Sequence, residues 1–404
     1  MTITVVSGPT LLYDWSEVSN GVNLHGPRIV WSDAGFMVAA WSNLDAQVRA
    51  IRVDAIGNPV GDVIEPVVGS ANFIDLSGLA TQADGSFAFA WLEATTSSPP
   101  QVLDEGFAFF DASGTDQAGR VGGWPSVNFD EATPQVLALA NGDYLLVRMA
   151  EKQTKNGPID LLQGQVFDAD GTAQGGRFIL SDDYARPAAA TSLPDGNGVL
   201  LYTTFVGKYR LMGQLVDESG APTGEAFVVR TLAGSDHLFM HGQGDIDVVP
   251  LATGGFAVVW AEAHGPLADP NTPAGAVMVQ LMSASGVRLG GPITVESSAS
   301  IKSLIDISIV ELANGGFAVS TTGTAGPIVG QSPVYLYDMH GNALGPAEDL
   351  GGGFFDLELT SLGQIAGLSV GVGGATSTVL DFGIGSDVVG TSGNDRLYGK
   401  SRLD

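Results

Sequence analysis

Two short phrases alternate along the chain and define an internal repeat. The first is a tight turn followed by an apolar strand, as in DAGFMVAAW at 33–41 and ATGGFAVVW at 252–260. The second is a strand that ends in a glycine-centred turn, as in VFDADGTAQGG at 166–176. Copies of the first phrase begin at residues 33, 83, 140, 194, 252 and 312, so one repeat spans 50 to 60 residues. That length accommodates four antiparallel strands joined by hairpin turns.

The best-defined repeat shows how its strands are arranged. Strands are expected at 246–252, 256–263, 277–284 and 292–297. Four-stranded units that repeat radially form the blades of a β-propeller, in which each blade packs on its two neighbours. Six such units are clear in the sequence, and together they predict an all-β fold.

A seventh unit has weaker signals. Its three strands are expected at 355–362, 364–372 and 376–383. The N-terminal segment 2–8 has strand character without a partner nearby in sequence, so it is expected to supply the missing fourth strand. We therefore predict a seven-bladed β-propeller of four-stranded antiparallel blades over residues 1–382, with the N-terminal strand closing the last blade. Six or eight blades, or a less regular β-solenoid, are the alternatives.

Recurrent aspartates and aromatic residues in the repeats have a structural explanation. In an Asp-x-x-Gly turn the carboxylate can accept hydrogen bonds from turn N–H groups, and the glycine takes the left-handed conformation. Such turns begin at Asp54, Asp111, Asp168, Asp217 and Asp338. Aromatic side chains at fixed positions of the second strand are expected to pack between blades; they are Phe36, Trp41, Phe87, Trp91, Tyr144, Phe256, Trp260 and Phe317. Neither set is expected to take part in chemistry.

Charge and composition exclude several functional classes. The chain has 17 Lys and Arg against 44 Asp and Glu, a formal net charge of −27. Such a surface repels nucleic acids and anionic membranes, because phosphate binding requires clustered basic residues. There is no cysteine, which excludes disulfides, thiolate metal sites and a cysteine nucleophile. The N-terminal MTITVVSGPTLLYDW lacks the basic and apolar regions of an ordinary secretory signal, and no apolar run reaches transmembrane length.

The composition changes near residue 383, where glycine and aspartate dominate. The stretch GTSGNDRLYG at 390–399 resembles one turn of the GGxGxDxUx nonapeptide of the RTX (haemolysin-type calcium-binding repeat) family. The propeller phrases also look like the repeats that precede RTX arrays in proteins exported by type I secretion. This resemblance implies that residues 383–404 begin a truncated RTX β-roll and that the protein is secreted. It also implies a Ca²⁺ site at Asp387, Gly393 and Asp395, which needs further turns because calcium takes six or more oxygen ligands.

The longer, irregular connections of a propeller open on one face, where ligand sites are expected. The richest of them is 231–247, with Asp236, His237, His241 and Asp245. Its nitrogen and oxygen donors suit Zn²⁺, Mn²⁺ or another divalent ion. Histidines four residues apart share a face only on a helix, however, and the glycines of this loop argue against a helix. The alternative is a polar, solvated loop.

Four further residues on the same face are candidates for ligand binding. His25 and Arg28 are expected at the mouth of the channel, Trp124 lies in GGWPSVNFDE, and Arg186 follows two aspartates and a tyrosine. Aromatic and basic side chains among acidic ones can bind a sugar or a uronate. Because every propeller rim carries such residues, the alternative is an ordinary polar surface.

These observations leave three functional hypotheses. The first is a secreted binding, adhesion or passenger module that presents propeller loops to an extracellular glycan or protein partner. The alternative is a secreted polysaccharide-acting enzyme, a lyase or hydrolase, with its site at the channel mouth. A structural spacer is the third. Nucleic-acid binding and membrane insertion are not expected.

Overall fold

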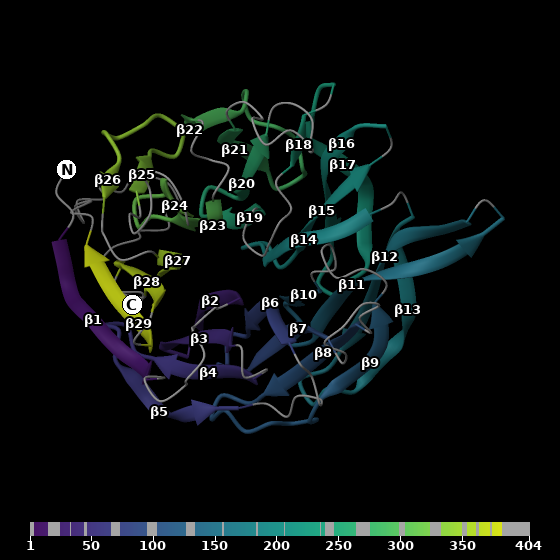
Figure 1. Ribbon diagram of the computed structural model, residues 1–404, viewed down its shortest axis with the longest axis horizontal. Coiled ribbons are helices and arrows are strands. Elements are labelled where there is room, and N and C mark those ends of the chain that lie inside the picture. Colours follow the sequence, from purple (N-terminus) through teal and green to yellow (C-terminus); the bar gives the residue numbers. More distant parts are fainter. Residues whose placement is uncertain are drawn as a thin grey trace.

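The computed structural model describes most of the predicted propeller and none of the glycine-rich tail. The described residues are 4–14, 25–32, 34–43, 47–65, 73–94, 103–126, 134–155, 157–182, 185–205, 207–234, 236–238, 246–263, 275–298, 304–323, 333–349, 354–360, 363–371 and 374–381. They form seven antiparallel sheets arranged in a ring (Figure 1), and no helix occurs among them. The predicted seven-bladed, all-β propeller is therefore confirmed. The predicted start of an RTX roll at 383–404 lies outside the described residues.

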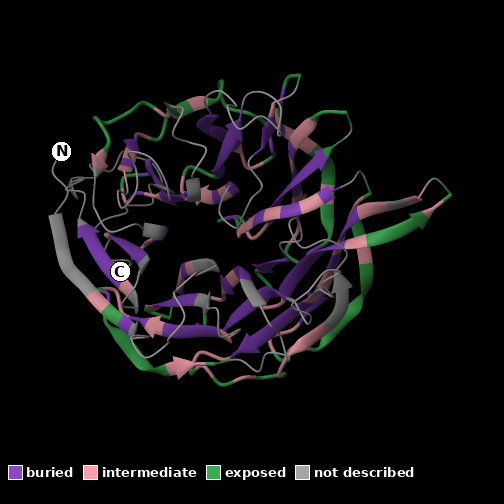
Figure 2. Ribbon diagram, viewed as in Figure 1, coloured by how far each residue is buried: buried purple, intermediate pink, exposed green. Residues whose placement is uncertain are grey.

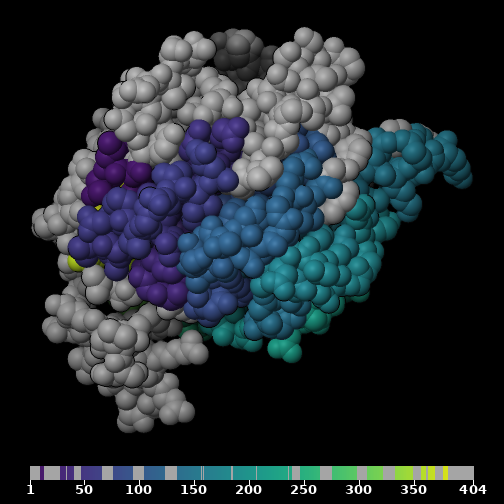
Figure 3. All heavy atoms as spheres, turned by 90° about the horizontal axis from the view of Figure 1, so that it is seen from below, coloured from purple at the N-terminus to yellow at the C-terminus, as the bar shows by residue number. Residues whose placement is uncertain are grey.

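The four strands of each blade are lettered a to d from the channel outward. Blades 1 and 2 contain β2 (His25–Ser32), β3 (Phe36–Asn43), β4 (Gln47–Val53), β5 (Pro59–Ile64), β6 (Phe73–Thr81), β7 (Phe87–Ala94), β8 (Leu103–Phe110) and β9 (Val121–Ser126). Blades 3 and 4 contain β10 (Gln135–Ala138), β11 (Tyr144–Thr154), β12 (Gly157–Phe167), β13 (Ala173–Ser181), β14 (Ala185–Ser192), β15 (Gly198–Phe205), β16 (Tyr209–Val216) and β17 (Pro222–Thr231). The hairpin of β11 and β12 projects beyond the rim (Figure 3).

The remaining three blades follow the same plan with one addition. Blades 5 and 6 contain β18 (His237–Leu238), β19 (Ile246–Leu251), β20 (Gly255–Ala263), β21 (Gly275–Ser283), β22 (Ile293–Ser298), β23 (Leu304–Glu311), β24 (Phe317–Gly323), β25 (Pro333–Tyr337) and β26 (Glu348–Asp349). Blade 7 contains β27 (Phe354–Leu359), β28 (Ile365–Gly371), β29 (Gly374–Asp381) and, as its outer strand, β1 (Thr4–Asp14). Strand β18 is the addition, a short strand that pairs with β20.

The N-terminal strand closes the ring as predicted. It pairs antiparallel with β29, from Thr4 opposite Asp381 to Asp14 opposite Gly374. The sequence analysis ended this strand at residue 8, whereas β1 runs to Asp14 with three irregularities in its register. The sequence of β1 does not alternate strictly between apolar and polar residues. The register shifts allow this strand to remain paired along the whole of β29. The two ends of the propeller sequence are thereby joined in one sheet.

The repeated turns have the predicted hydrogen bonds. In blade 1 the Asp54 Oδ1 atom accepts from the N–H groups of Ile56 and Asn58, at 3.0 and 2.8 Å. Gly57 takes φ 90°, a conformation that favours glycine. The four other Asp-x-x-Gly turns repeat this pattern, at Asp111, Asp168, Asp217 and Asp338. The aspartates therefore serve the turns, as the sequence indicated.

Aromatic side chains fill the interfaces between blades, where the middle strands are buried and the outer strands exposed (Figure 2). Six of the eight predicted packing residues are fully or almost fully buried; they are Phe87, Trp91, Tyr144, Phe256, Trp260 and Phe317. Phe36 is partly buried, and the side chain of Trp41 lies outside the described set. The Trp91 ring lies over Gly106 of the neighbouring strand, so closely that an added Cβ would be 2.2 Å from Trp91 Cε2.

This contact gives a stability prediction. Gly106→Ala should lower the free energy of unfolding by about 2 kcal/mol, because the tryptophan ring must move out of a filled interface. Gly176→Ala, where an added Cβ meets nothing within 4 Å, should change it by no more than about 0.5 kcal/mol. Urea titration of both variants compares the two values. Equal stabilities would show that the ring does not occupy this position.

Candidate functional site

The first strands of the blades surround a central channel with a volume of about 350 Å³. Its wall is formed by segments of β2, β6, β10, β14, β19, β23 and β27. Most of the lining residues are small or apolar. The charged residues that line it are Arg28, Asp247, Glu311, Asp356 and Glu358. The charges come from blades 1, 5, 6 and 7 and leave the opposite wall, from blades 2 to 4, uncharged.

Most of these charged residues lie at one equivalent position of the first strand. It lies seven residues before the glycine of the turn that joins the first and second strands. In every blade the residue paired with it on the second strand lies five residues after that glycine. In blades 1 to 7 it is occupied by Arg28, Gly78, Gln135, Ala189, Asp247, Ser308 and Asp356. The seven residues therefore occupy equivalent places around the ring. Glu358 lies two residues further along β27 and so on the same side of that strand.

Side chains at this position join neighbouring blades. Asp247 Oδ2 accepts from the N–H of Ile309 in blade 6, and Asp356 Oδ2 accepts from the N–H of Ile29 in blade 1, both at 2.9 Å. Between blades 6 and 7, the N–H of Leu357 donates to Ser308 Oγ at 3.1 Å. These N–H groups lie on the edge of a sheet that has no further strand to pair with them. The three contacts satisfy them and link blades 5, 6, 7 and 1.

The channel raises the pKa values of its carboxyl groups. Burial, and then the neighbouring Asp356, raise the pKa of Asp247 to about 6. Burial also raises the pKa of Asp356, although nearby Arg28 opposes the increase. Burial first, and the neighbouring Asp356 second, raise the pKa of Glu358 to about 8. At neutral pH the channel therefore contains a protonated carboxylic acid, Glu358, beside the ionised carboxylate of Asp247 and an arginine.

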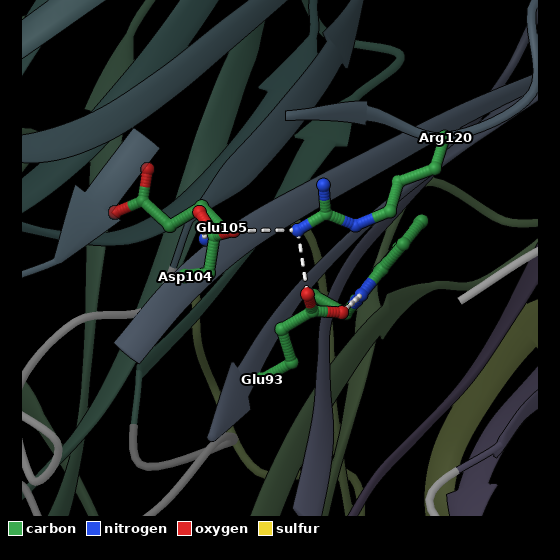
Figure 4. Close-up of polar contacts among 5 residues, drawn as sticks. Glu93, Asp104, Glu105 and Arg120 are labelled. Carbon is green, nitrogen blue, oxygen red and sulfur yellow. Dashed lines mark hydrogen bonds and ion pairs between the residues drawn. The ribbon is translucent and has the colours of Figure 1, made fainter. Parts of the chain in front are cut away.

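A second polar network lies within blade 2, outside the channel lining (Figure 4). Arg120 Nη2 contacts Glu93 Oε1 at 2.5 Å and Asp104 Oδ2 at 2.8 Å, and Trp91 Nε1 donates to Glu93 Oε2 at 3.0 Å. Blade 5 repeats the pair of tryptophan and glutamate, but its arginine comes from β17 of blade 4. There Trp260 donates to Glu262, which also receives two hydrogen bonds from Arg230. Because the motif recurs with the repeat and fixes a buried tryptophan, we assign it a structural role.

Glu105 forms an ion pair with Arg148 across the interface of blades 2 and 3. The distance from Arg148 Nε to Glu105 Oε2 is 2.6 Å, and the glutamate side chain is fully buried. Its Oε1 atom has no hydrogen-bond partner among the residues that the structure describes. Burial raises the pKa of Glu105 to about 7, and Arg148 opposes this increase.

Of the residues predicted at the channel mouth, Arg28 lines the channel. His25 begins β2, but its side chain is not among those described. The same holds for Trp124, which lies in β9. Arg186 in β14 forms an ion pair with Asp160 of blade 3 at 3.7 Å. The structure does not bring Arg186 into the channel lining.

The predicted metal loop is only partly described. His237 is buried in β18, and Asp236 precedes it with its N–H donating to Ala233. His241 and Asp245 lie outside the described residues, as do Asp387, Gly393 and Asp395 of the tail. Within the described part of the chain, no three histidine, aspartate or glutamate side chains form a group that could hold a metal ion. No helix in that part is long and apolar enough to span a membrane.

Asp356 and Glu358 were not predicted as site residues, and Asp247 was placed where the predicted loop 231–247 overlaps the strand expected at 246–252. A signal for the two aspartates was present in the sequence. When the seven first strands are aligned on their turn glycines, Asp247, Asp356 and Arg28 share one column. A charged residue at that position stands out, because a strand on the inner edge of a blade otherwise carries small or apolar residues.

The Glu105–Arg148 pair gives a second prediction. Arg148→Met should destabilise the protein by about 3 kcal/mol at pH 8, because it leaves a buried carboxylate without a counter-charge. The loss should shrink at pH 5.5, where Glu105 can be protonated. Adding Glu105→Gln to Arg148→Met should recover most of the loss at pH 8. Thermal unfolding of the two variants at both pH values measures this; a loss independent of pH would contradict the assignment.

Comparison with known proteins extends the fold assignment only. No protein-family model matches the sequence, and no curated protein matches it. A protein of unknown function from Dyadobacter fermentans has a similar structure, with a TM-score of 0.51 and 12% identity over 94% of this chain and 99% of that one. An α-L-arabinanase from Penicillium chrysogenum, complexed with arabinobiose, gives a TM-score of 0.46 and 14% identity over 94% and 98%. An endo-arabinase from Bacteroides thetaiotaomicron gives 0.35 and 10% over 60% and 87%. At these identities the likeness concerns the propeller fold.

Proposed function

We propose that the protein is a glycan-processing enzyme, a hydrolase whose site is the carboxylate-lined end of the central channel. The observation that carries this proposal is the set of three carboxyl groups, Asp247, Asp356 and Glu358, gathered with Arg28 on one side of a 350 Å³ space. Glycoside hydrolysis requires one carboxylic acid and one carboxylate on either side of the bond that breaks. Enzymes obtain that pair by raising the pKa of one of them.

The structural task of this strand position does not require charge. Ser308 performs the inter-blade contact in blade 6 with a neutral hydroxyl group, while blades 5 and 7 use carboxylates for the same contact. Burying a carboxylate costs free energy that a serine avoids. The excess of acid over structural need supports a chemical role.

The environments of the carboxyl groups suggest separate roles. Glu358 is protonated at neutral pH and would donate its proton to the glycosidic oxygen as the bond from carbon to that oxygen breaks. A water molecule would add to the anomeric carbon and pass its proton to the ionised Asp247. Asp356 accepts hydrogen bonds from Ile29, Ser308 and Leu357, so it would position β27 and sustain the high pKa of Glu358.

Hydrolysis suits this channel better than elimination. A lyase removes a proton next to a uronate carboxylate, and it needs a base together with cationic groups that hold that carboxylate. The described channel lining contains neither histidine nor tyrosine, and its single cation faces several acids. A polyanionic substrate would be repelled by these acids and by the net charge of −27. The expected substrate is therefore a neutral glycan.

We further propose that the protein acts outside the cell. The RTX-like GTSGNDRLYG motif supports this location, and through it type I secretion. Calcium would be bound by Asp387, Gly393 and Asp395 together with further turns of a roll. A binding or passenger module with the same export route is the competing function, and the carboxylates of the channel favour the enzyme over it.

The hydrolase proposal is tested by the release of reducing ends from neutral polysaccharides such as arabinan, xylan and β-glucan. Activity should be highest between about pH 6 and pH 8, because Asp247 must be ionised and Glu358 protonated. Glu358→Gln should lower kcat by at least about 100-fold. Glu225→Gln, an exposed glutamate of β17, should leave kcat unchanged.

Two results would contradict this assignment. One is a wild-type protein that hydrolyses none of a broad panel of glycans. The other is a Glu358→Gln variant that keeps wild-type kcat, which would move the reaction away from the channel.

A further inference from the structure

Three aromatic rings form a row on the face where the first strands begin. Phe205 ends β15 and pairs with Tyr209, the first residue of β16, and their ring centroids are 4.8 Å apart. The Tyr209 ring lies 6.5 Å from the ring of His237 in β18. The row therefore leads from the outer hairpin of blade 4 to the short extra strand of blade 5.

Strand β18 places the inner end of this row close to the channel. It pairs with β20 on the same edge that β19 uses, with His237 opposite Ala263 and Ile246 opposite Trp260. His237 thus lies three residues along β20 from Ile246, or about 10 Å. Ile246 and Asp247 line the channel. The row starts beside the channel rim and runs outward from it.

Exposure increases along the row. His237 is buried, Tyr209 is partly buried, and Phe205 is 51% exposed at the tip of its hairpin. A cross-strand aromatic pair stabilises a hairpin, but that role does not require half of a phenylalanine to face water. Flat apolar rings on a rim suit the apolar faces of sugar rings, whose hydroxyl groups point outward.

We propose that Phe205 and Tyr209, with the buried His237 supporting the Tyr209 ring, form an accessory binding track for a neutral polysaccharide chain whose reacting end enters the channel. The proposal rests on the hydrolase function above and specifies its substrate as a polymer several units long. A neutral chain is required, because the same polymer must reach the acidic channel.

Affinity electrophoresis tests the track through binding rather than turnover. Full-length protein is run in native gels that contain arabinan, xylan, β-glucan or, as an acidic arm, polygalacturonate. Wild-type protein should be retarded by at least one neutral polysaccharide and not by polygalacturonate. Phe205→Ala should weaken that retardation about fivefold, whereas Ile179→Ala should not change it. Ile179 is the matched control, since it is also 51% exposed but lies on β13 of blade 3.

The outcomes separate this proposal from the hydrolase proposal. Glu358→Gln should be retarded like wild type, because it removes the acid and leaves the track intact. Equal retardation of wild type and Phe205→Ala would overturn the track, and so would retardation by polygalacturonate alone or by no polymer. Loss of activity in Glu358→Gln would still support the hydrolase in each of these cases.

Discussion

The ring depends on hydrogen bonds between the first strands of neighbouring blades. Each first strand is the inner edge of its sheet, so half of its backbone N–H groups have no strand partner. Asp247, Ser308 and Asp356 supply oxygens to such groups in the next blade, and Asp356 does so where blade 7 meets blade 1. Near the C-terminal ends of the first strands, the Thr81 hydroxyl group of blade 2 donates to the carbonyl group of Trp31 in blade 1. The N-terminal strand then seals blade 7 from outside through its pairing with β29.

The carboxyl group of Glu358 in the channel destabilises the fold as the pH rises. Glu358 has a pKa of about 8 in the folded protein and 4.5 as its ordinary value. Between these values the folded state binds more protons than the unfolded state, so the stability contributed by the protonated group is lost as the pH increases. One such group changes the free energy of unfolding by at most about 1.4 kcal/mol per pH unit. A neutral side chain would avoid this loss, which is why we attribute the acids to function rather than to folding.

The repeat allowed the fold to be predicted in detail but the site only in part. Turn glycines and apolar strands depend on local sequence, so the seven blades, the Asp-x-x-Gly turns and the buried Trp91 and Trp260 could be inferred. The channel is lined by segments of all seven blades, and Asp247 and Asp356 are over one hundred residues apart in the chain. A search for loops that contain histidine therefore identified Arg28, which lies near His25, and missed Glu358. Only the alignment of equivalent strand positions brings these residues together, because the ring converts equivalent positions into neighbours.

The account depends most directly on a carboxylic acid that stays protonated in the channel at neutral pH. A ¹³C NMR titration of protein labelled at the glutamate side-chain carboxyl carbon measures this, with the Glu358 resonance identified by its loss in Glu358→Gln. The account predicts a titration midpoint near pH 8 for that resonance. A midpoint near 4.5, the ordinary value for glutamate, would contradict it, because Glu358 would then be ionised throughout the neutral range and could not act as the acid.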